Sequence, residues 1–260
     1  MRTGTAAELW SAAVARRSGH RVELASYRIG AVLMLAGGFH FVVWLVAGGS
    51  WEGPVSWRKP TTFGLSFGLT LITVAWISSY LIMRPRPRAW LLGVFAADCV
   101  LEVAGITVQA WRGVPSHFNT QTPIDRTIAM SLAAGGAVLV IVLGTMAVVA
   151  LRGRVRGGRD LRLAVRAGFA FLLIGLATGV LMIAKGTVLY RTGDHQRAFD
   201  TAGSWKPVHG VTLHAILVLP LIAEVGLLLG WSEHRRHRAV AIGTALYVAA
   251  TLAAVWLSVH

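Results

Sequence analysis

The segment TIAMSLAAGGAVLVIVLGTMAVVAL, residues 127–151, is twenty-five residues long and contains no charged side chain. A helix needs about twenty predominantly apolar residues to cross the hydrocarbon core of a bilayer. An uninterrupted apolar run of this length is the pattern of a membrane span rather than of a helix in a soluble domain. The segment therefore predicts a transmembrane helix, and the rest of the chain is built from segments of the same kind.

Six more apolar segments predict six further transmembrane helices, at residues 28–47, 61–83, 89–110, 162–186, 209–231 and 239–259. Seven spans fill nearly the whole chain, and the loops between them are short. We therefore expect an all-α, polytopic, seven-helix bundle in which consecutive helices are neighbours. Residues 28–260 form this transmembrane domain. Residues 1–27 form a basic cytoplasmic tail, which is either an amphipathic helix on the inner leaflet or a partly ordered segment.

The composition of the chain also indicates a membrane protein. Hydrophobic residues make up 55% of it, charged residues only 14%, and the mean hydropathy is +0.62. A soluble domain has about a quarter of its residues charged. The net charge of +14 would suit nucleic acid, but the basic residues lie in short loops with no nucleic-acid-binding motif. We expect the lipid bilayer, and no nucleic acid, as a partner.

The distribution of the basic residues predicts the orientation of the bundle. Seventeen of the 25 Lys and Arg residues fall in the N-terminal tail and in the loops on its side of the membrane, and eight fall on the other side. The basic segments on the first side are residues 1–28, 84–88, 152–166 and 235–238. By the positive-inside rule, the N-terminus lies inside and the C-terminus outside.

Several ionisable side chains lie within the predicted spans, where they are candidates for function. Asp98, Glu102 and Gln109 stand at i, i+4 and i+11 on the third span, and therefore share one helix face, which must point into the bundle. His40 lies in the first span and His214 in the sixth.

Three of these groups are expected at a similar depth in the membrane. At 1.5 Å per residue, Glu102 lies about 12 Å, His40 about 10 Å and His214 about 8 Å below the outer end of its span. We therefore take Glu102, Asp98, His214 and His40 as catalytic candidates. His209 is about 140° around the helix from His214, so we expect it at the mouth of the bundle with Lys206.

The outer loops are the second candidate region, because loops carry binding residues more often than spans do. They hold aromatic, basic and amide side chains close to the predicted helix ends. The candidates for substrate binding are Trp57, Lys59, Gln109, Arg112, His117, Asn119, Lys206 and His209.

Three stretches carry a resemblance to known proteins: WRKPTTFGLSFGL at 57–69, QAWRGVPSHFNTQTPID at 109–125 and SWKPVHGVTLHAILVLP at 204–220. They resemble a widespread group of bacterial seven-span membrane proteins whose functions are mostly unassigned. The resemblance runs from about residue 30 to 230, departs from the group in the 190–205 loop, and implies a multi-pass protein of the bacterial inner membrane. The positions that match are Glu102, Gln109, Arg112, Gly113, Ser116, His117, Phe118 and Asn119, and then Lys206, His209, Leu213, His214 and Ala215.

In length, span count, buried carboxyl groups and aromatic content, the chain is also similar to small transmembrane terpene cyclases. This similarity implies an enzyme that cyclises a prenyl chain by acid–base catalysis without a cofactor. Glu102 or Asp98 would donate a proton to a lipophilic substrate, His214 would take up the final proton, and aromatic faces would stabilise the cation.

Two other functions are compatible with the same residues. His40 and His214 could bind haem b as axial ligands, or could hold a metal ion together with Glu102. A carrier or sensor without enzymatic activity is the remaining alternative.

Overall fold

The computed structural model describes residues 21–195, 197–198 and 204–259, so the first twenty residues of the predicted tail lie outside the described part. Residues 21–27 of that tail belong to the first helix. Seven helices are each long and apolar enough to cross a membrane, which confirms all seven predicted spans as helices. They are α2 (Arg21–Ala47), α3 (Arg58–Ser78), α4 (Pro85–Trp111), α5 (Pro123–Leu151), α6 (Arg159–Arg191), α8 (Lys206–Leu228) and α9 (Glu233–Val259).

The helices begin earlier than their apolar segments, because polar residues form the first turns. Proline stands at the first or second position of α4, α5 and α8, where its missing N–H costs no hydrogen bond. Helix α3 ends at Ser78, before the predicted residue 83. The chain turns there, and Leu81 forms an isolated bridge with Val155 in the loop before α6. Within the described ranges this bridge is the only β-type pairing.

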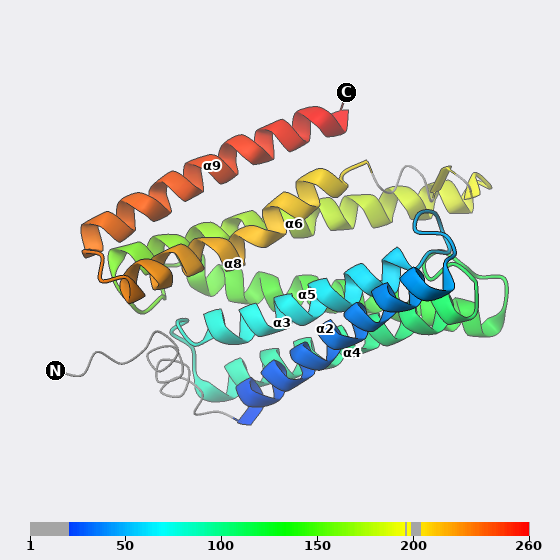
Figure 1. Ribbon diagram of the computed structural model, residues 1–260, viewed down its shortest axis with the longest axis horizontal. Helices are drawn as coiled ribbons and strands as arrows, with labels where there is room; N and C mark the ends of the chain where they lie inside the picture. Colours follow the sequence, from blue (N-terminus) through cyan, green and yellow to red (C-terminus); the bar gives the residue numbers. More distant parts are fainter. Residues whose placement is uncertain (1–20, 196, 199–203, 260) are drawn as a thin grey trace.

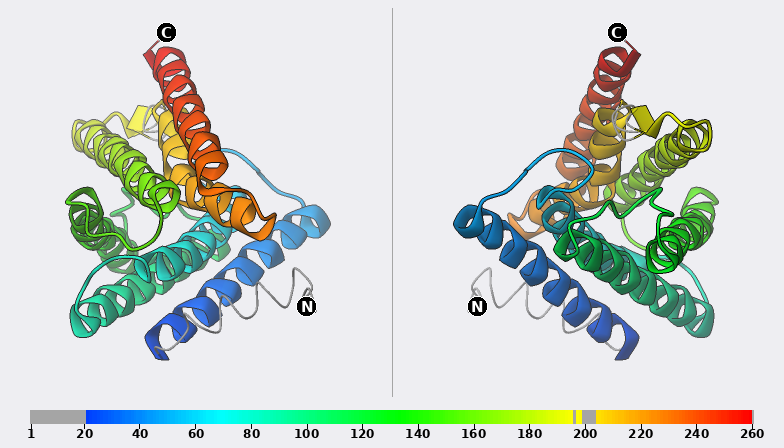
Figure 2. Two further views of the ribbon diagram at one scale, coloured as in Figure 1. Left: turned by 90° about the vertical axis from the view of Figure 1, so that its left-hand side faces the viewer. Right: turned by 90° about the vertical axis from the view of Figure 1, so that its right-hand side faces the viewer.

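Consecutive helices run in alternating directions along the long axis of the molecule (Figure 1). Each packs on the next, and α3 also meets α8. Seen along that axis, α2, α3 and α4 lie on one side, α6, α8 and α9 lie on the other, and α5 joins the two groups (Figure 2). Helices α2 and α9 lie at opposite edges of the bundle and run in the same direction along the long axis, as an odd number of spans requires (Figure 1).

Helices α2 and α3 pack with their backbones in contact. A Cβ atom on Gly64 would lie 2.7 Å from the Cα of Gly37, and one on Gly68 would lie 2.5 Å from the carbonyl oxygen of Gly30. Small residues allow this close approach, which is a common basis of helix association in membranes. Glycine is abundant in the sequence, and at this interface it allows tight helix packing.

Two ion pairs hold helices together at the end where α2 starts. Arg88 of α4 lies 2.6 Å from the buried Glu23 of α2. At the same end, Arg236 of α9 lies 2.5 Å from the buried Asp160 of α6. These pairs connect helices that are not consecutive, and they therefore fix the arrangement of the bundle.

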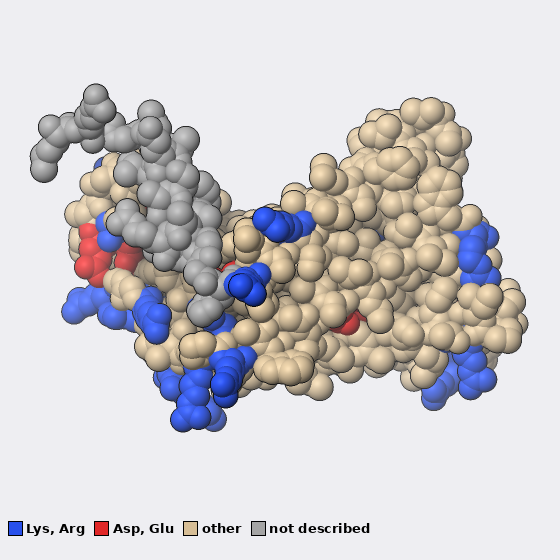
Figure 3. Space-filling model, turned by 90° about the horizontal axis from the view of Figure 1, so that it is seen from below, with Lys and Arg blue, Asp and Glu red and all other residues tan. Residues whose placement is uncertain are grey.

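The surface divides into charged ends and an apolar middle. Lys and Arg side chains gather at the two ends of the molecule, and the band between them is mostly uncharged (Figure 3). Large apolar side chains are exposed along α2 and α9, among them Val32, Leu35, Leu246 and Leu252. An exposed apolar belt of this kind is the surface of a multi-pass membrane protein. We call the end that holds the first turns of α3, α5 and α8 the outer end, after the predicted orientation.

Candidate functional site

The polar face predicted on α4 points into the bundle. The side chains of Asp98, Glu102 and Gln109 are all buried, with exposed fractions of 7%, 4% and 0%. This confirms the prediction that the spacing i, i+4, i+11 places them on one inward face. All three face α5, but they meet it in two different ways.

Asp98 and Glu102 form a pair of carboxyl groups aimed at one point of α5, which we call the carboxyl pair. A Cβ atom on Gly135 would lie 2.6 Å from Oδ1 of Asp98 and 2.7 Å from Oε1 of Glu102, so glycine leaves the room that both need. Oδ2 of Asp98 is buried and has no hydrogen-bond partner among the described residues. Two adjacent buried carboxylates repel each other and are poorly solvated, so we expect the pair to hold a proton.

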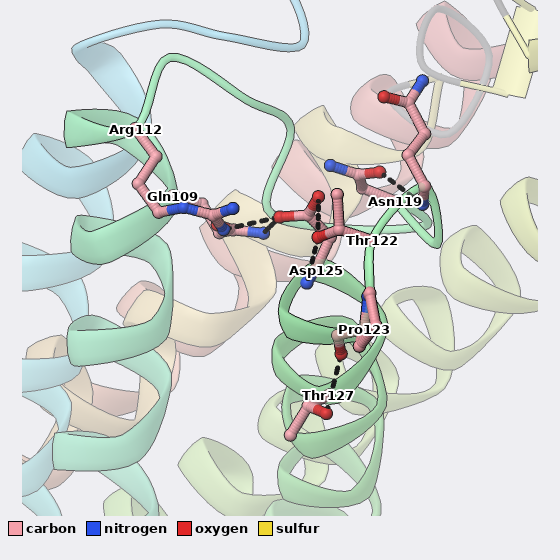
Figure 4. A network of polar contacts seen from close by, with 8 residues as sticks. Gln109, Arg112, Asn119, Thr122, Pro123, Asp125 and Thr127 are labelled. Carbon is pink, nitrogen blue, oxygen red and sulfur yellow. Dashed lines mark hydrogen bonds and ion pairs between the residues drawn. The ribbon is translucent and has the colours of Figure 1, made fainter.

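Gln109, nearer the outer end of α4, belongs to a saturated polar network (Figure 4). Its Nε2 donates to Oδ1 of Asp125 at 2.9 Å, and Arg112 Nη1 donates to the same oxygen at 2.5 Å. Arg112 also donates to Oε1 of Gln109, and Thr122 Oγ1 donates to Oδ2 of Asp125 at 2.6 Å. We call these four residues the Asp125 network. Gln109 and Arg112, predicted to bind substrate, here hold α4 against the start of α5.

Asp125 was not among the site residues predicted from the sequence, although a local sequence pattern marks its position. Thr122 and Asp125 form the pattern T-x-x-D just before an apolar run, which is typical of a helix N-terminus. The backbone N–H of Asp125 donates to Thr122 Oγ1 at 3.2 Å, as that pattern requires.

His40 is fully engaged in packing. Its Nδ1 donates to the carbonyl oxygen of Ala36 at 2.6 Å, and its Nε2 accepts from Trp111 Nε1 at 3.1 Å. The ring of Trp57, a predicted substrate-binding residue, stacks on the imidazole with centroids 6.1 Å apart. With both nitrogens hydrogen-bonded, His40 offers no free nitrogen to a haem iron or a metal ion.

The structure places His209 and His214 the other way round from the prediction. His214 is exposed, and its Nδ1 donates to Gly210 of its own helix at 2.5 Å. His209 is half-buried and donates from Nδ1 to the carbonyl oxygen of Gly175 on α6 at 2.7 Å. The two histidines face different sides of α8, as the helix geometry predicts, but the inward face is the one that carries His209.

The alternative metal site is therefore not assembled. His214 faces away from the bundle, so it does not join His40 and Glu102. In the part of the chain that the structure describes, no group of three or more His, Cys, Asp or Glu side chains could hold a metal ion.

Three cations gather at the outer ends of α3 and α8, and we call them the outer cation cluster: Arg58, Lys59 and Lys206. Lys59 is close enough to be repelled by both of the others. Its Nζ donates to the carbonyl oxygen of Pro54 at 2.6 Å. Arg58 forms an ion pair with the exposed Glu52 at 3.1 Å. Lys59 and Lys206, both predicted to bind substrate, are thus brought together.

His117 lies beside this cluster, in the loop between α4 and α5. Its ring is 6.0 Å from that of Phe63 on α3, and its Nδ1 is 2.9 Å from the hydroxyl of Ser116. Burial, reinforced by the positive charge of Lys59, lowers the pKa of His117 to about 4. His117 is therefore neutral at physiological pH.

The same loop is fixed to α6 by Phe118, which has a backbone φ of 62°. Its ring occupies the space beside Gly186, where a Cβ atom would lie 2.5 Å from Cζ, and it stacks on Tyr190 at 6.3 Å. Asn119 follows and is buried, with Oδ1 accepting from the N–H of Gln121 at 3.1 Å. Its Nδ2 has no partner among the described residues.

One further buried acid, Glu224 of α8, accepts a hydrogen bond from the hydroxyl of Tyr80 at 2.5 Å. It links the end of α3 to α8 on the inner side of the bundle. Unlike Asp98, it has a direct side-chain donor.

Comparisons with family models, with curated proteins and with solved structures give no match. Both resemblances stated from the sequence therefore remain predictions. The function has to be inferred from two features, the carboxyl pair and the outer mouth. At 1.5 Å per residue, Glu102 lies about 15 Å along α4 from Arg112 at that mouth.

Proposed function

We propose that this protein is an integral membrane enzyme that carries out acid–base chemistry on a lipophilic substrate. The carboxyl pair carries the proposal: two buried acids are aimed at one glycine of α5, and one of their oxygens lacks a partner. A buried acid whose oxygens are all hydrogen-bonded serves stability. An acid without donors keeps its proton and can give it to a substrate.

The specific reaction that we propose is the cyclisation of a prenyl chain, started by protonation. Glu102 gives its proton to a carbon–carbon double bond, whose electron pair forms the new C–H bond and leaves a carbocation. A second double bond of the chain attacks this cation and forms the ring bond. Loss of a proton from a neighbouring carbon forms a new double bond, and the product is an isomer of the substrate.

The carboxyl pair also serves as the acceptor of the final proton. His214 was expected to fill this role, but its exposed position on α8 removes it from the interior. Asp98 is our candidate for the acceptor of this proton, because its carboxyl group faces the same point of α5 as that of Glu102. One pair can thus donate and recover the proton within a single turnover.

A proton-coupled carrier is the second candidate. The observation that favours it is the division of the helices into two groups, α2–α4 and α6–α9, joined by α5 (Figure 2). Movement of one helix group against another is a common basis of transport. The carboxyl pair would then bind the transported proton.

The decisive experiment is incubation of the purified chain, reconstituted in nanodiscs, with farnesyl and geranylgeranyl diphosphates, followed by mass spectrometry of the products. We expect cyclic isomers from the wild type and at least a roughly 100-fold loss in Glu102→Gln and Asp98→Asn. Glu224→Gln is the matched control, because it removes another buried acid and keeps an acceptor for Tyr80.

Full activity of Glu102→Gln would disprove the acid assignment. If the wild type converts no polyene, but proteoliposomes show proton-coupled uptake that Glu102→Gln abolishes, the carrier replaces the enzyme.

A further inference from the structure

The outer cation cluster lies where two helix N-termini meet. Arg58 and Lys59 are the first residues of α3, and Lys206 is the first residue of α8. The N-terminus of a helix carries exposed N–H groups and a partial positive charge, and so attracts anions. Three cations at such a place repel one another, and the repulsion reaches from Lys206 to both Arg58 and Lys59.

Buried polar atoms without partners lie in the same region. The hydroxyl of Ser56, two residues before Arg58, is in a side chain only 5% exposed. Three donors that are close to the cluster along the chain lack a hydrogen-bond partner among the described residues: Ser56 Oγ, Arg58 Nε and Ser204 Oγ. Each of them can donate, and leaving a buried donor unpaired is costly.

Among the described residues, Glu52 is the acid that faces the cluster. It pairs with Arg58 and attracts Lys206, so its single charge offsets only part of the three positive charges. The side chain of Glu52 is mostly exposed, and its ion pair with Arg58 therefore stabilises little. Lys59 is held by the carbonyl oxygen of Pro54, which shapes the loop before α3. Lys206 is exposed and free to reach an anion above the two helix ends.

We propose that the outer cation cluster, together with Ser56, binds an anion of the phosphate class. A phosphate group offers several acceptor oxygens and enough negative charge for three cations, and it suits helix N-termini. The anion is either free in solution or the headgroup of a lipid. Resting on the proposed function, we identify it with the headgroup of the prenyl substrate, whose chain reaches down to the carboxyl pair, about 15 Å along α4 from Arg112 at the same mouth.

Binding can be measured on the full chain in phosphatidylcholine nanodiscs. One arm adds inorganic pyrophosphate at constant ionic strength, and the other adds phosphatidic acid to the bilayer. At saturation we expect the melting temperature to rise by about 5 °C. A rise with pyrophosphate indicates that a free anion is accepted, and a rise with phosphatidic acid alone indicates a lipid headgroup; both outcomes support the site.

A matched pair of lysine variants tests where the anion binds. Lys206→Gln should weaken binding about tenfold. Lys185, on α6, is also exposed but lies outside the cluster, so Lys185→Gln should leave binding unchanged. Ser56→Ala tests the unpartnered buried hydroxyl separately. No shift with either anion, or equal shifts in the two lysine variants, would overturn the inference.

The carboxyl pair separates this inference from the proposed function. Glu102→Gln should bind the anion as the wild type does, because Glu102 lies away from the cluster. Anion binding without any isomerised product would leave the site standing and disprove the cyclase.

Discussion

Helices α4 and α5 meet at two acidic places that are built in opposite ways. At the outer end, Asp125 accepts hydrogen bonds from Gln109, Arg112 and Thr122, and both of its oxygens are satisfied. Deeper in the same interface, the carboxyl pair faces a bare glycine, and Asp98 Oδ2 has no partner among the described residues. All of these acids are buried.

The difference separates stability from reactivity. An ionised buried carboxylate is tolerated when donors replace its lost hydration, and it then fixes the helices that supply them. A carboxyl pair without such donors contributes little to packing and keeps a proton that can be transferred. Each of the following changes tests whether the two places really differ in this way.

The largest effect on folding is expected from Asp125→Ala. It leaves Arg112 and the amide of Gln109 without their acceptor, and we expect the largest loss in the free energy of unfolding among these variants. Thermal denaturation in detergent measures this loss. Asp125→Asn, which keeps one acceptor oxygen, should lose less, and equal stability of all three proteins would show that the network is not structural.

A smaller effect is expected when a methyl group is added between the helices. In Gly135→Ala the new Cβ would meet both carboxyl groups, so they must move apart, at a cost of about 2 kcal/mol and with loss of activity. The control is the next residue: a Cβ on Gly136 meets nothing within 4 Å, so Gly136→Ala should keep both stability and activity. If the two variants behave alike, the two carboxyl groups do not lie against Gly135 as described.

Glu102→Gln should change stability in the opposite direction from Asp125→Ala. A neutral isostere removes the repulsion between the two carboxyl groups and costs no hydrogen bond that the described residues make to Glu102. We therefore expect no loss and a gain of up to about 1 kcal/mol. Denaturation of the same preparation used for the activity assay measures it. A loss as large as that of Asp125→Ala would mean that the carboxyl pair is a structural site as well.

The smallest effect concerns the loop that joins the two helices. The pKa of His117 is lowered to about 4 in the folded protein, from an ordinary value of 6.5, so its contribution to stability is present above pH 6.5 and is lost as the pH falls toward 4. Allowing for its partial exposure, we expect a loss on the order of 1 kcal/mol between pH 7 and 5. His117→Gln should flatten this part of the pH profile, and an unchanged profile would argue against a buried neutral histidine.

The sequence predicted the spans and the inward face of α4 because both depend on local periodicity. Asp98, Glu102 and Gln109 share a face on any regular helix, and charged residues on the opposite face would have been exposed to lipid. Periodicity also gave the angle between His209 and His214. It could not show which of the two faces α6, because that depends on how α8 is rotated in the bundle.

Contacts between distant parts of the chain could not be predicted either, because they also depend on how the helices are placed in the bundle. The depth of His40 was estimated from its span, yet its role is set by Trp111, which is 71 residues away and takes up the free ring nitrogen. A similar depth for Glu102, His40 and His214 was therefore not a sign of proximity. Asp125 was the exception, since the pattern T-x-x-D is local and could have been used.

Helix α6 is longer than the hydrocarbon core of a bilayer is thick. Its 33 residues extend about 50 Å, whereas the hydrocarbon core is about 30 Å thick. At a common tilt of about 20°, roughly a dozen of its residues lie outside the core. We expect part of this excess at its last turn, where Tyr190 stacks on Phe118 beside the mouth. A lipid that approaches from the side of α6 would meet this turn first, so we expect lateral access to the bundle to depend on the direction of approach.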